Sequence, residues 1–335
     1  MKVLLHDTTC SFLTPGGKTT HAVKLQQEIS KLGVDIEFAR WWDASQSDAD
    51  IVHFLALDMP LARSCKAHGM KTFYSMIFDY ETNRPPREQR RHILKNRILD
   101  KVPRLAGNRY WRALEFIDRV QFMHTADQET ACRFFPRFIS PDTTVVIPHA
   151  YDPADIRISD GLDIRACEFP EKYLVSCANI SQRKQSVLLA RLAKKARVPV
   201  VFIGSRNQRD PYYLSFKAEV DNKYVFDPGF VTREWRDCIE RNASGFVLLS
   251  QGESGCIAVY EAAAYNLPLL LSDLPWAKHY EDPTDVFFCD FNNIENAVAQ
   301  LRAFYDSASV LDHMPFRART WGDVAKMYVR EYESL

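Results

Sequence analysis

Residues 245–264 read GFVLLSQGESGCIAVYEAAA, and this stretch contains the pattern that decides the fold. Its first six residues form an apolar run typical of a buried strand, and its end is rich in alanine, the strongest helix former. The stretch therefore predicts a strand, a glycine-containing turn and a helix. Such a turn directs backbone N–H groups and the positive end of a helix dipole to one point, which favours an anionic ligand such as a phosphate.

Two glutamates, Glu253 and Glu261, lie eight residues apart in this stretch. On a single helix, eight residues that rise ~1.5 Å each would separate them by about 12 Å. A hydrolase pair that flanks one glycosidic bond needs roughly 5–9.5 Å between carboxyl groups. The spacing instead favours an extended ligand with a phosphate between its ends, and a nucleotide sugar has that layout. The alternative is an ordinary strand–helix unit with two solvated glutamates.

Composition excludes several classes of protein. The chain has 335 residues, of which 46% are hydrophobic and 26% charged, so two globular domains are expected. Acidic and basic residues balance at 43 each, which gives no indication of nucleic-acid binding. The eight cysteines show no Cys-x-x-Cys motif and no metal-ligand spacing, which favours a reducing compartment over disulfides or structural zinc. No signal peptide or long apolar run is evident, so we expect a cytoplasmic protein.

Short β-rich runs alternate with helical patterns along the chain, as a parallel α/β fold requires. We expect two doubly wound, Rossmann-like domains with a cleft between them: an acceptor-side domain at 1–155, a nucleotide-sugar-binding domain at 156–310, and a helix at 311–335 that crosses back to the first domain. The predicted strands are Lys2–Asp7, Ile36–Arg40, Asp50–Leu55, Lys71–Phe78, Arg119–Thr125, Thr143–His149, Tyr173–Ala178, Pro199–Gly204, Tyr224–Phe226, Gly245–Ser250, Pro268–Asp273 and Val286–Cys289.

The Glu253–Glu261 segment resembles the Glu-x7-Glu signature of retaining glycosyltransferases of the GT-B fold, the group-1, family-4-like class. The resemblance implies that Glu253 lies near the transferred sugar and that Glu261 binds the ribose hydroxyls. It also implies that backbone N–H groups between the two glutamates hold the diphosphate. The residues that would supply these groups are Ser254, Gly255, Cys256 and Ile257.

Other segments resemble the same family. Gly16 and Gly17 open a helix after the first strand, as does the family's glycine loop, which faces the donor diphosphate. In the second domain Lys184 matches a diphosphate-clamping lysine, but Asn179 stands where the family has an arginine. Arg183 could supply the missing charge, since asparagine donates only neutral hydrogen bonds. A solvated helical turn is the alternative for Arg183 and Lys184.

Further candidates come from the resemblance and from single residues. The loop with Gly229, Phe230 and Val231 resembles the one that receives the nucleotide base. His124, at the end of a predicted strand, could touch the sugar or the leaving phosphate; a buried histidine satisfied by its neighbours is the alternative. His53 is expected to be structural. Residues 148–152 resemble the family's connector between domains, with His149 in place of an asparagine.

The region 84–112 is strongly basic within a neutral chain. It holds ten Arg or Lys residues and two acidic ones, with apolar residues at partly helical spacing. Such a surface could lie on anionic lipid headgroups at the inner face of a membrane. A pocket for a phosphorylated acceptor and a plain solvated helix are the alternatives.

Together these features favour a metal-independent, retaining glycosyltransferase. It would need no cofactor, would take a nucleotide-diphosphate sugar as co-substrate, and would act on a glycan or on a lipid-linked or phosphorylated acceptor. In the family, helix dipoles and Lys or Arg side chains stabilise the departing diphosphate without a metal. Two other possibilities are a non-catalytic binding or assembly protein of the same fold and another GT-B enzyme such as a nucleotide-sugar epimerase. The sequence identifies neither base, sugar nor acceptor.

Overall fold

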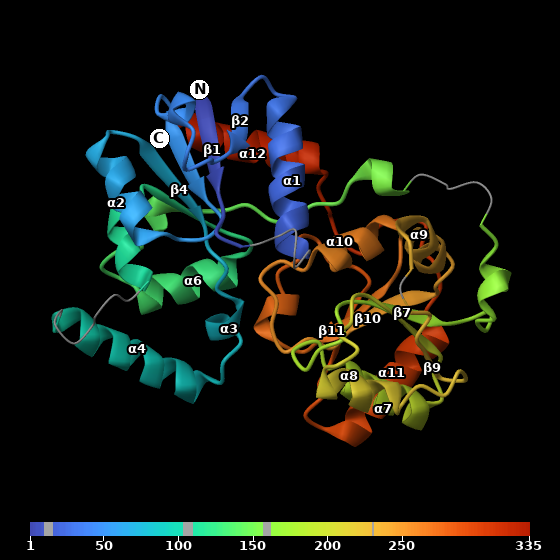
Figure 1. Cartoon of the computed structure of the whole chain (residues 1–335). Helices are drawn as coiled ribbons and strands as arrows, with labels where there is room; N and C mark the ends of the chain where they lie inside the picture. The colour runs from blue at the N-terminus through green and yellow to red at the C-terminus, as the bar shows by residue number, and fades with distance from the viewer. Residues whose placement is uncertain (10–15, 103–109, 157–161, 230) are drawn as a thin grey trace. The chain divides into compact units, whose positions relative to one another are not determined.

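The computed structural model of the protein describes residues 1–9, 16–102, 110–156, 162–229 and 231–335. The chain forms two compact units (Figure 1). Unit 1 comprises Met1–His149 and Arg319–Leu335, and unit 2 comprises Ala150–Ala318. The unit boundaries therefore lie at 149/150 and 318/319, whereas the sequence placed them at 155/156 and 310/311.

Unit 1 contains a six-stranded parallel sheet in the order β2-β1-β3-β4-β5-β6. Its strands are β1 (Lys2–His6), β2 (Asp35–Phe38), β3 (Ile51–Phe54), β4 (Lys71–Ser75), β5 (Arg119–Phe122) and β6 (Thr144–Val146). Its helices are α1 (Gly17–Ser30), α2 (Met59–Ala67), α3 (Asp79–Thr82), α4 (Pro86–Lys101), α6 (Thr125–Phe134) and α12 (Trp321–Glu333). Short 3₁₀ segments are Ala44–Gln46, Tyr110–Phe116 and Pro141–Thr143.

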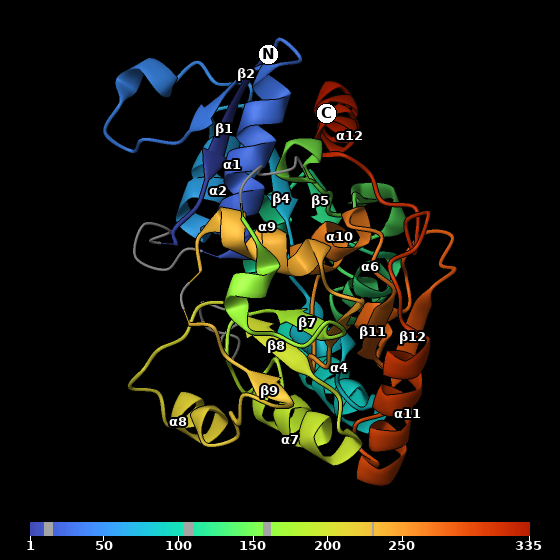
Figure 2. The same ribbon diagram turned by 90° about the vertical axis from the view of Figure 1, so that its right-hand side faces the viewer.

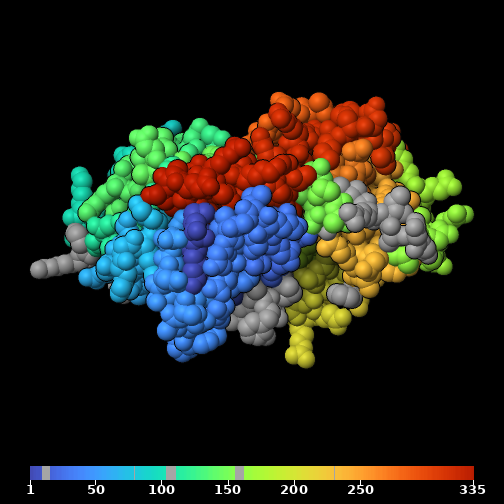
Figure 3. All heavy atoms as spheres, turned by 90° about the horizontal axis from the view of Figure 1, so that it is seen from above, coloured from blue at the N-terminus to red at the C-terminus, as the bar shows by residue number. Residues whose placement is uncertain are grey.

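Helices cover both faces of the unit 1 sheet. Side chains alternate along each strand, so Leu4 and Phe54 point to a core shared with α2 and α6, where Phe134 is buried. The opposite face is covered by α1 and α12, which contact each other. From above, the C-terminal helix lies along the N-terminal residues of unit 1 (Figure 3).

The C-terminal helix α12 is anchored in unit 1 by polar and aromatic contacts. Thr320 caps its N-terminus by accepting a hydrogen bond from Asp323 N at 3.2 Å. Tyr332 Oη lies 2.7 Å from His53 Nδ1, and the other ring nitrogen of His53 lies 2.8 Å from Ser75 Oγ. His53 is fully buried, so its structural role agrees with the expectation from sequence.

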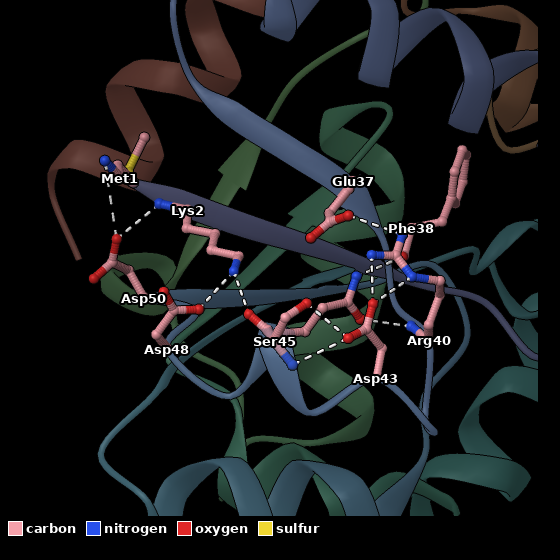
Figure 4. Close-up of polar contacts among 10 residues, drawn as sticks. Met1, Lys2, Glu37, Phe38, Arg40, Asp43, Ser45, Asp48 and Asp50 are labelled. Carbon is pink, nitrogen blue, oxygen red and sulfur yellow. Dashed lines mark hydrogen bonds and ion pairs between the residues drawn. The ribbon is translucent and has the colours of Figure 1, made fainter.

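Charged residues fasten the chain around β1 and β2 (Figure 4). The backbone N–H of Lys2 donates to Asp50 at 2.7 Å, and the Lys2 ammonium group donates to the Ser45 carbonyl at 2.7 Å. Arg40 bridges Glu37 and Asp43, each at 2.8 Å. These contacts tie the connection between β2 and β3 to the start of the chain.

Unit 2 contains a second six-stranded parallel sheet, in the order β12-β11-β10-β7-β8-β9. Its strands are β7 (Leu174–Cys177), β8 (Val200–Ile203), β9 (Val225–Phe226), β10 (Gly245–Leu248), β11 (Leu269–Ser272) and β12 (Val286–Cys289). Its helices are α7 (Ser186–Ala196), α8 (Pro211–Lys217), α9 (Arg233–Arg241), α10 (Ile257–Ala264) and α11 (Ile294–Ser307), with 3₁₀ segments at Pro153–Ile156, Ile164–Cys167 and Pro275–Ala277.

Two cores sandwich the unit 2 sheet. One core joins the sheet to α9 and α10 through buried residues such as Ile239 and Val259. The other joins it to α7, α8 and α11 through residues such as Leu189, Phe216 and Leu301. The two helix groups lie on opposite faces of the sheet (Figure 2). The strand order is that of a doubly wound Rossmann fold, which reverses direction between β7 and β10.

All twelve predicted strands are present, and most end within one to three residues of the predicted limits. The predicted α/β fold with two doubly wound parallel sheets is confirmed. Within the described residues, no helix is both long and apolar enough to cross a membrane.

Candidate functional site

The candidate donor site of unit 2 lies where the strand order reverses. In an open parallel sheet, ligands bind beyond the carboxyl ends of the strands at this switch point. Here β7 leads into residues 178–185 and β10 leads into residues 249–256, and both segments follow the carboxyl ends of neighbouring strands. The topology therefore brings Lys184 and Glu253 together, although 69 positions separate them in sequence.

The turn after β10 is held from below by hydrogen bonds. The Ser250 carbonyl accepts from Ser272 Oγ at 2.6 Å and from Trp276 Nε1 at 3.0 Å. The Ser250 hydroxyl contacts the Glu253 carboxylate, and Gln251 N donates to the Arg183 carbonyl at 2.8 Å. These contacts fix Glu253 on a turn that precedes α10, so the two glutamates do not share a helix.

Glu253 is a buried carboxylate between two cations. It is 6% exposed, with Lys184 Nζ 2.6 Å and Arg183 Nη1 2.9 Å from its Oε1. Burial alone would raise the pKa of Glu253, but the adjacent Lys184 and Arg183 hold it below its ordinary value. Glu253 is therefore ionised at neutral pH. The structure places three predicted site residues at one point.

Lys184 is fixed and charged. Burial acts to lower its pKa, but nearby Cys256 and Glu253 raise the pKa of Lys184 above the ordinary value. Lys184 Nζ lies 4.0 Å from the Cys256 sulfur. Burial raises the pKa of Cys256 to about 11, so this side chain is a neutral thiol at physiological pH. Cys256 and Ile257 lie at the N-terminus of α10, where backbone N–H groups have no partner within the helix.

Glu261 lies in the second turn of α10 and is held by an arginine of α9. Arg236 donates to both carboxylate oxygens, at 3.4 and 3.3 Å. The guanidinium also lies 3.5 Å from Asp237 and 3.9 Å from Glu240. This cluster was not predicted. An Arg and a Glu four residues apart usually mark a solvated helix face, and their proximity to Glu261 depends on the packing of α9 on α10.

The predicted base-binding loop is stabilised by contacts of Arg206. Arg206 pairs with Asp227 and also contacts the carbonyls of Gly204, at 3.0 Å, and Gly229. Gly229 has a φ of +82°, a conformation that favours glycine. Val231 follows in the described chain, whereas Phe230 lies outside the described residues. The loop is thus held by a buried ion pair.

Asn179, which stands where the family has an arginine, is exposed and accepts a hydrogen bond from Ser205 Oγ at 2.6 Å. The chain passes very close to this point. A side chain at Gly204, whose φ is +152°, would place its Cβ 2.0 Å from the Ala178 carbonyl oxygen. Only glycine therefore fits at position 204, beside the turn that follows β7.

In unit 1, Gly16 is the N-cap of α1, and Gly17 is its first residue. Lys18 pairs with Asp7 at 2.6 Å and donates to Thr9 Oγ1 at 2.7 Å. The predicted loop before Gly16 falls on residues 10–15, which lie outside the described residues. The role predicted for Gly16 and Gly17 toward the donor stays a prediction.

His124 is the N-cap of α6 and is 2% exposed. Its Nδ1 accepts a hydrogen bond from Asp127 N at 3.2 Å, and its Nε2 lies 3.3 Å from the fully buried Asp127 carboxylate. These contacts favour the alternative of a buried histidine satisfied by its neighbours. His149 is also buried, between the rings of His21 and Trp321, and burial lowers its pKa well below the ordinary value.

The basic region forms helix α4, which has no buried residue. Leu94 and Ile98 are 60% and 55% exposed on it. Residues 103–109 of the region lie outside the described residues. Within the described part of the chain, no group of three or more His, Cys, Asp or Glu residues is placed to hold a metal ion.

Part of the chain matches a family model, and the whole chain resembles solved structures. Residues 168–321 match the model of a family described as glycosyl transferases group 1. Anabaena HepE, solved in complex with UDP and glucose, aligns with a TM-score of 0.62 and 13% identity over 100% of both chains. Sucrose-phosphate synthase from Thermosynechococcus elongatus aligns with a TM-score of 0.63 and 13% identity, over 99% of this chain and 95% of that one.

A third structure, AviGT4, is described as a glycosyltransferase involved in avilamycin A biosynthesis. It aligns with a TM-score of 0.63 and 16% identity, over 100% of this chain and 97% of that one. A search of curated proteins finds no match. At these identities the solved structures establish the fold, and the family match covers most of unit 2. The chain therefore has the GT-B fold, and its residues 168–321 are similar to glycosyl transferases group 1.

Proposed function

We propose that the protein transfers a sugar from a nucleotide-diphosphate sugar to an acceptor and retains the anomeric configuration. The observation that carries this proposal is the Glu253 carboxylate, ionised between Lys184 and Arg183 at the switch point, with Glu261 eight residues later. HepE, which shares the fold, was solved with UDP and glucose.

The residues divide the donor among them. Lys184 and Arg183, with the N-terminus of α10, face the diphosphate and stabilise the charge that develops as it leaves. Glu253 orients the sugar and favours the positive charge that develops on it. Glu261 accepts hydrogen bonds from the ribose hydroxyls. The acceptor attacks from the face that the diphosphate leaves, and a phosphate oxygen takes the acceptor's proton. These groups need neither a cofactor nor a metal.

The direct test is incubation of the protein with radiolabelled nucleotide sugars, with and without EDTA. Sugar transfer or slow donor hydrolysis that persists in EDTA supports a metal-independent transferase. Binding without turnover would favour a non-catalytic nucleotide-sugar-binding protein, an alternative that Asn179 at the arginine position supports. Interconversion of the free donor would favour an epimerase. A thermal-shift panel of UDP, GDP and ADP should identify the base, since a ligand at about 100 Kd stabilises by about 2.7 kcal/mol.

For the acceptor we propose a glycan or a lipid-linked substrate reached at an anionic membrane surface. The support is α4, which exposes Leu94 and Ile98 among basic residues, while Ile93 and Leu99 pack against the core of unit 1. The protein would then be cytoplasmic and peripheral at the inner face of the membrane. Electrostatic docking of exposed charges is screened over about 8 Å at physiological salt, so anionic liposomes should bind the protein at low salt and release it as salt rises.

A substitution separates α4 from the donor site. Replacing Arg87, Arg90, Arg91 and Lys95 with glutamine should abolish liposome binding and leave nucleotide affinity unchanged. If the wild type does not bind anionic liposomes at low salt, the proposal that α4 docks on a membrane is wrong. A soluble phosphorylated acceptor would then better explain the charges of α4.

A further inference from the structure

A buried charge cluster lies behind Glu261, where α9 and α10 lie side by side (Figures 1 and 2). A single guanidinium, that of Arg236, is shared by three carboxylates. They belong to Glu261 on α10 and to Asp237 and Glu240 on α9. Burial acts to lower the pKa of Arg236, but the three carboxylates raise it above its ordinary value. Arg236 therefore stays charged. The proposed function uses Glu261 and leaves the other members unexplained.

Glu240 is the deepest member of the cluster. Glu240 is 0% exposed, and Arg236 Nε lies 3.9 Å from its carboxylate. The other polar groups near it are Asp237, Glu261, the Cys177 thiol of β7 and the Tyr265 hydroxyl at the end of α10. Arg236 is therefore the cation that pairs with this interior carboxylate, and it also pairs with Glu261. An acid buried in this way would be costly without that cation.

We propose that Arg236 is a positioning residue for nucleotide binding: Glu240 retains it from the interior, and its planar fork fixes the Glu261 carboxylate for the ribose hydroxyls. This inference rests on the proposed role of Glu261. Arg236 contacts one hydrogen-bonding site on each carboxylate oxygen, and each oxygen keeps a second lone pair for a hydroxyl donor. Without the fork, the flexible Glu261 side chain must be ordered when the nucleotide binds, which weakens affinity.

A merely structural role of Arg236 would affect all nucleotides alike, so the test compares two ligands. The probes are the tightest-binding of UDP, GDP and ADP and its 2′,3′-dideoxy counterpart, which lacks both ribose hydroxyls. Affinities are measured by calorimetry for the wild type, Arg236→Met and Arg236→Lys. Arg233→Met is the matched control, since Arg233 lies one turn earlier on α9, is 48% exposed at its side chain, and reaches Asp237 at 3.8 Å.

The wild type should prefer the ribose form by roughly tenfold or more, because hydrogen bonds to a charged group are lost with the hydroxyls. Arg236→Met should reduce that preference to about one- to threefold and leave affinity for the dideoxy form nearly unchanged. Arg236→Lys should restore part of the preference, since a single ammonium keeps the charge but loses the fork. Arg233→Met should behave as the wild type.

Three outcomes would overturn the proposal. If Arg236→Met lowers affinity for both ligands equally, Arg236 supports the fold alone. If Arg236→Met keeps the full preference for ribose, Glu261 needs no positioning. If the wild type itself does not distinguish the two ligands, the ribose role of Glu261 fails as well, which separates the failure of the proposed function from that of this inference.

A second variant covers the case in which Arg236→Met does not fold. Its loss removes the cation that Glu240 and Glu261 share, whereas Asp237 keeps its contact with Arg233. The double variant Arg236→Met/Glu240→Gln also removes the carboxylate that is buried most deeply. We expect this variant to fold and to show the same loss of ribose preference. Glu240→Gln alone should retain the fork but hold it less firmly, with a preference between those of the wild type and Arg236→Met.

Discussion

The surroundings of Glu253 and Glu261 differ in charge balance, although eight residues separate the two glutamates. At Glu253, two cations pair with one carboxylate, and they hold the pKa of Glu253 below its ordinary value despite burial. At Glu261, one guanidinium pairs with three carboxylates. Burial raises the pKa of the most deeply buried carboxyl group, that of Glu240, to about 7. The first region suits a group that must stay ionised beside an anionic ligand. The second attracts hydroxyl donors and is sensitive to pH.

The largest expected effect comes from removing one of the two cations that pair with Glu253. Lys184→Met should lower the free energy of unfolding by roughly 3–5 kcal/mol, because it leaves a buried carboxylate short of its partner. Arg183→Met is the matched control and should cost less than about 1 kcal/mol, since the Arg183 side chain is 51% exposed. Urea unfolding at pH 7 measures both. Equal losses would show that burial does not distinguish the two cations.

The opposite region responds to pH. The raised pKa of Glu240 means that the folded state binds its proton more tightly than the unfolded chain, whose ordinary value is 4.5. Its contribution to stability is present below about pH 4.5 and is lost as pH rises through about 7. Glu240→Gln should lie within about 1 kcal/mol of the wild type at pH 5 and exceed its unfolding free energy by about 3 kcal/mol at pH 8.

Denaturation measured from pH 4.5 to 8.5 tests this prediction. Glu253 has the opposite sign: its lowered pKa gives stability above its unfolded value that is lost as pH falls through the folded one. A constant difference between Glu240→Gln and the wild type across this range would contradict the buried-acid interpretation.

Substitution of the two glutamates themselves sharpens the comparison in function. Glu261→Ala should weaken binding of the free nucleoside diphosphate by ~1.5–3 kcal/mol, because the ribose hydroxyls lose a charged acceptor. Glu253→Ala should lower kcat with the sugar donor and spare nucleotide affinity. Calorimetry and donor turnover separate the two effects. Equal losses of free-nucleotide affinity would refute this division of roles.

The smallest expected effect concerns Asn179. Asn179→Arg adds a cation at an exposed position and should strengthen nucleoside diphosphate binding by about 1 kcal/mol, with little effect on the bare nucleoside. Lys184→Met, in contrast, should weaken diphosphate binding far more than nucleoside binding. Calorimetry with both ligands measures each ratio. Equal changes for nucleoside and diphosphate would place both residues in support of the fold.

Local pattern accounts for what could be predicted from sequence. The strand and helix within Gly245–Ala264 could be predicted from the apolar run and the alanine-rich end of that one segment. The family resemblance made Lys184 and Glu253 candidate site residues. The contact of Arg183 with Glu253 could not be predicted, because it depends on the pairing of β7 with β10. The cluster at Arg236 was missed because it depends on the packing of α9 on α10. The cap at His124 carried a local signal, an acidic residue three positions later, that could have been used.

The division of the chain has a consequence for its synthesis. Unit 2 is one continuous segment, whereas unit 1 needs both ends of the chain. Because α12 supplies the buried Tyr328 and Tyr332 that contact His53 and Phe73, unit 1 lacks part of its core until α12 has left the ribosome. Unit 2 can therefore assemble before unit 1, because all of unit 2 is translated before α12.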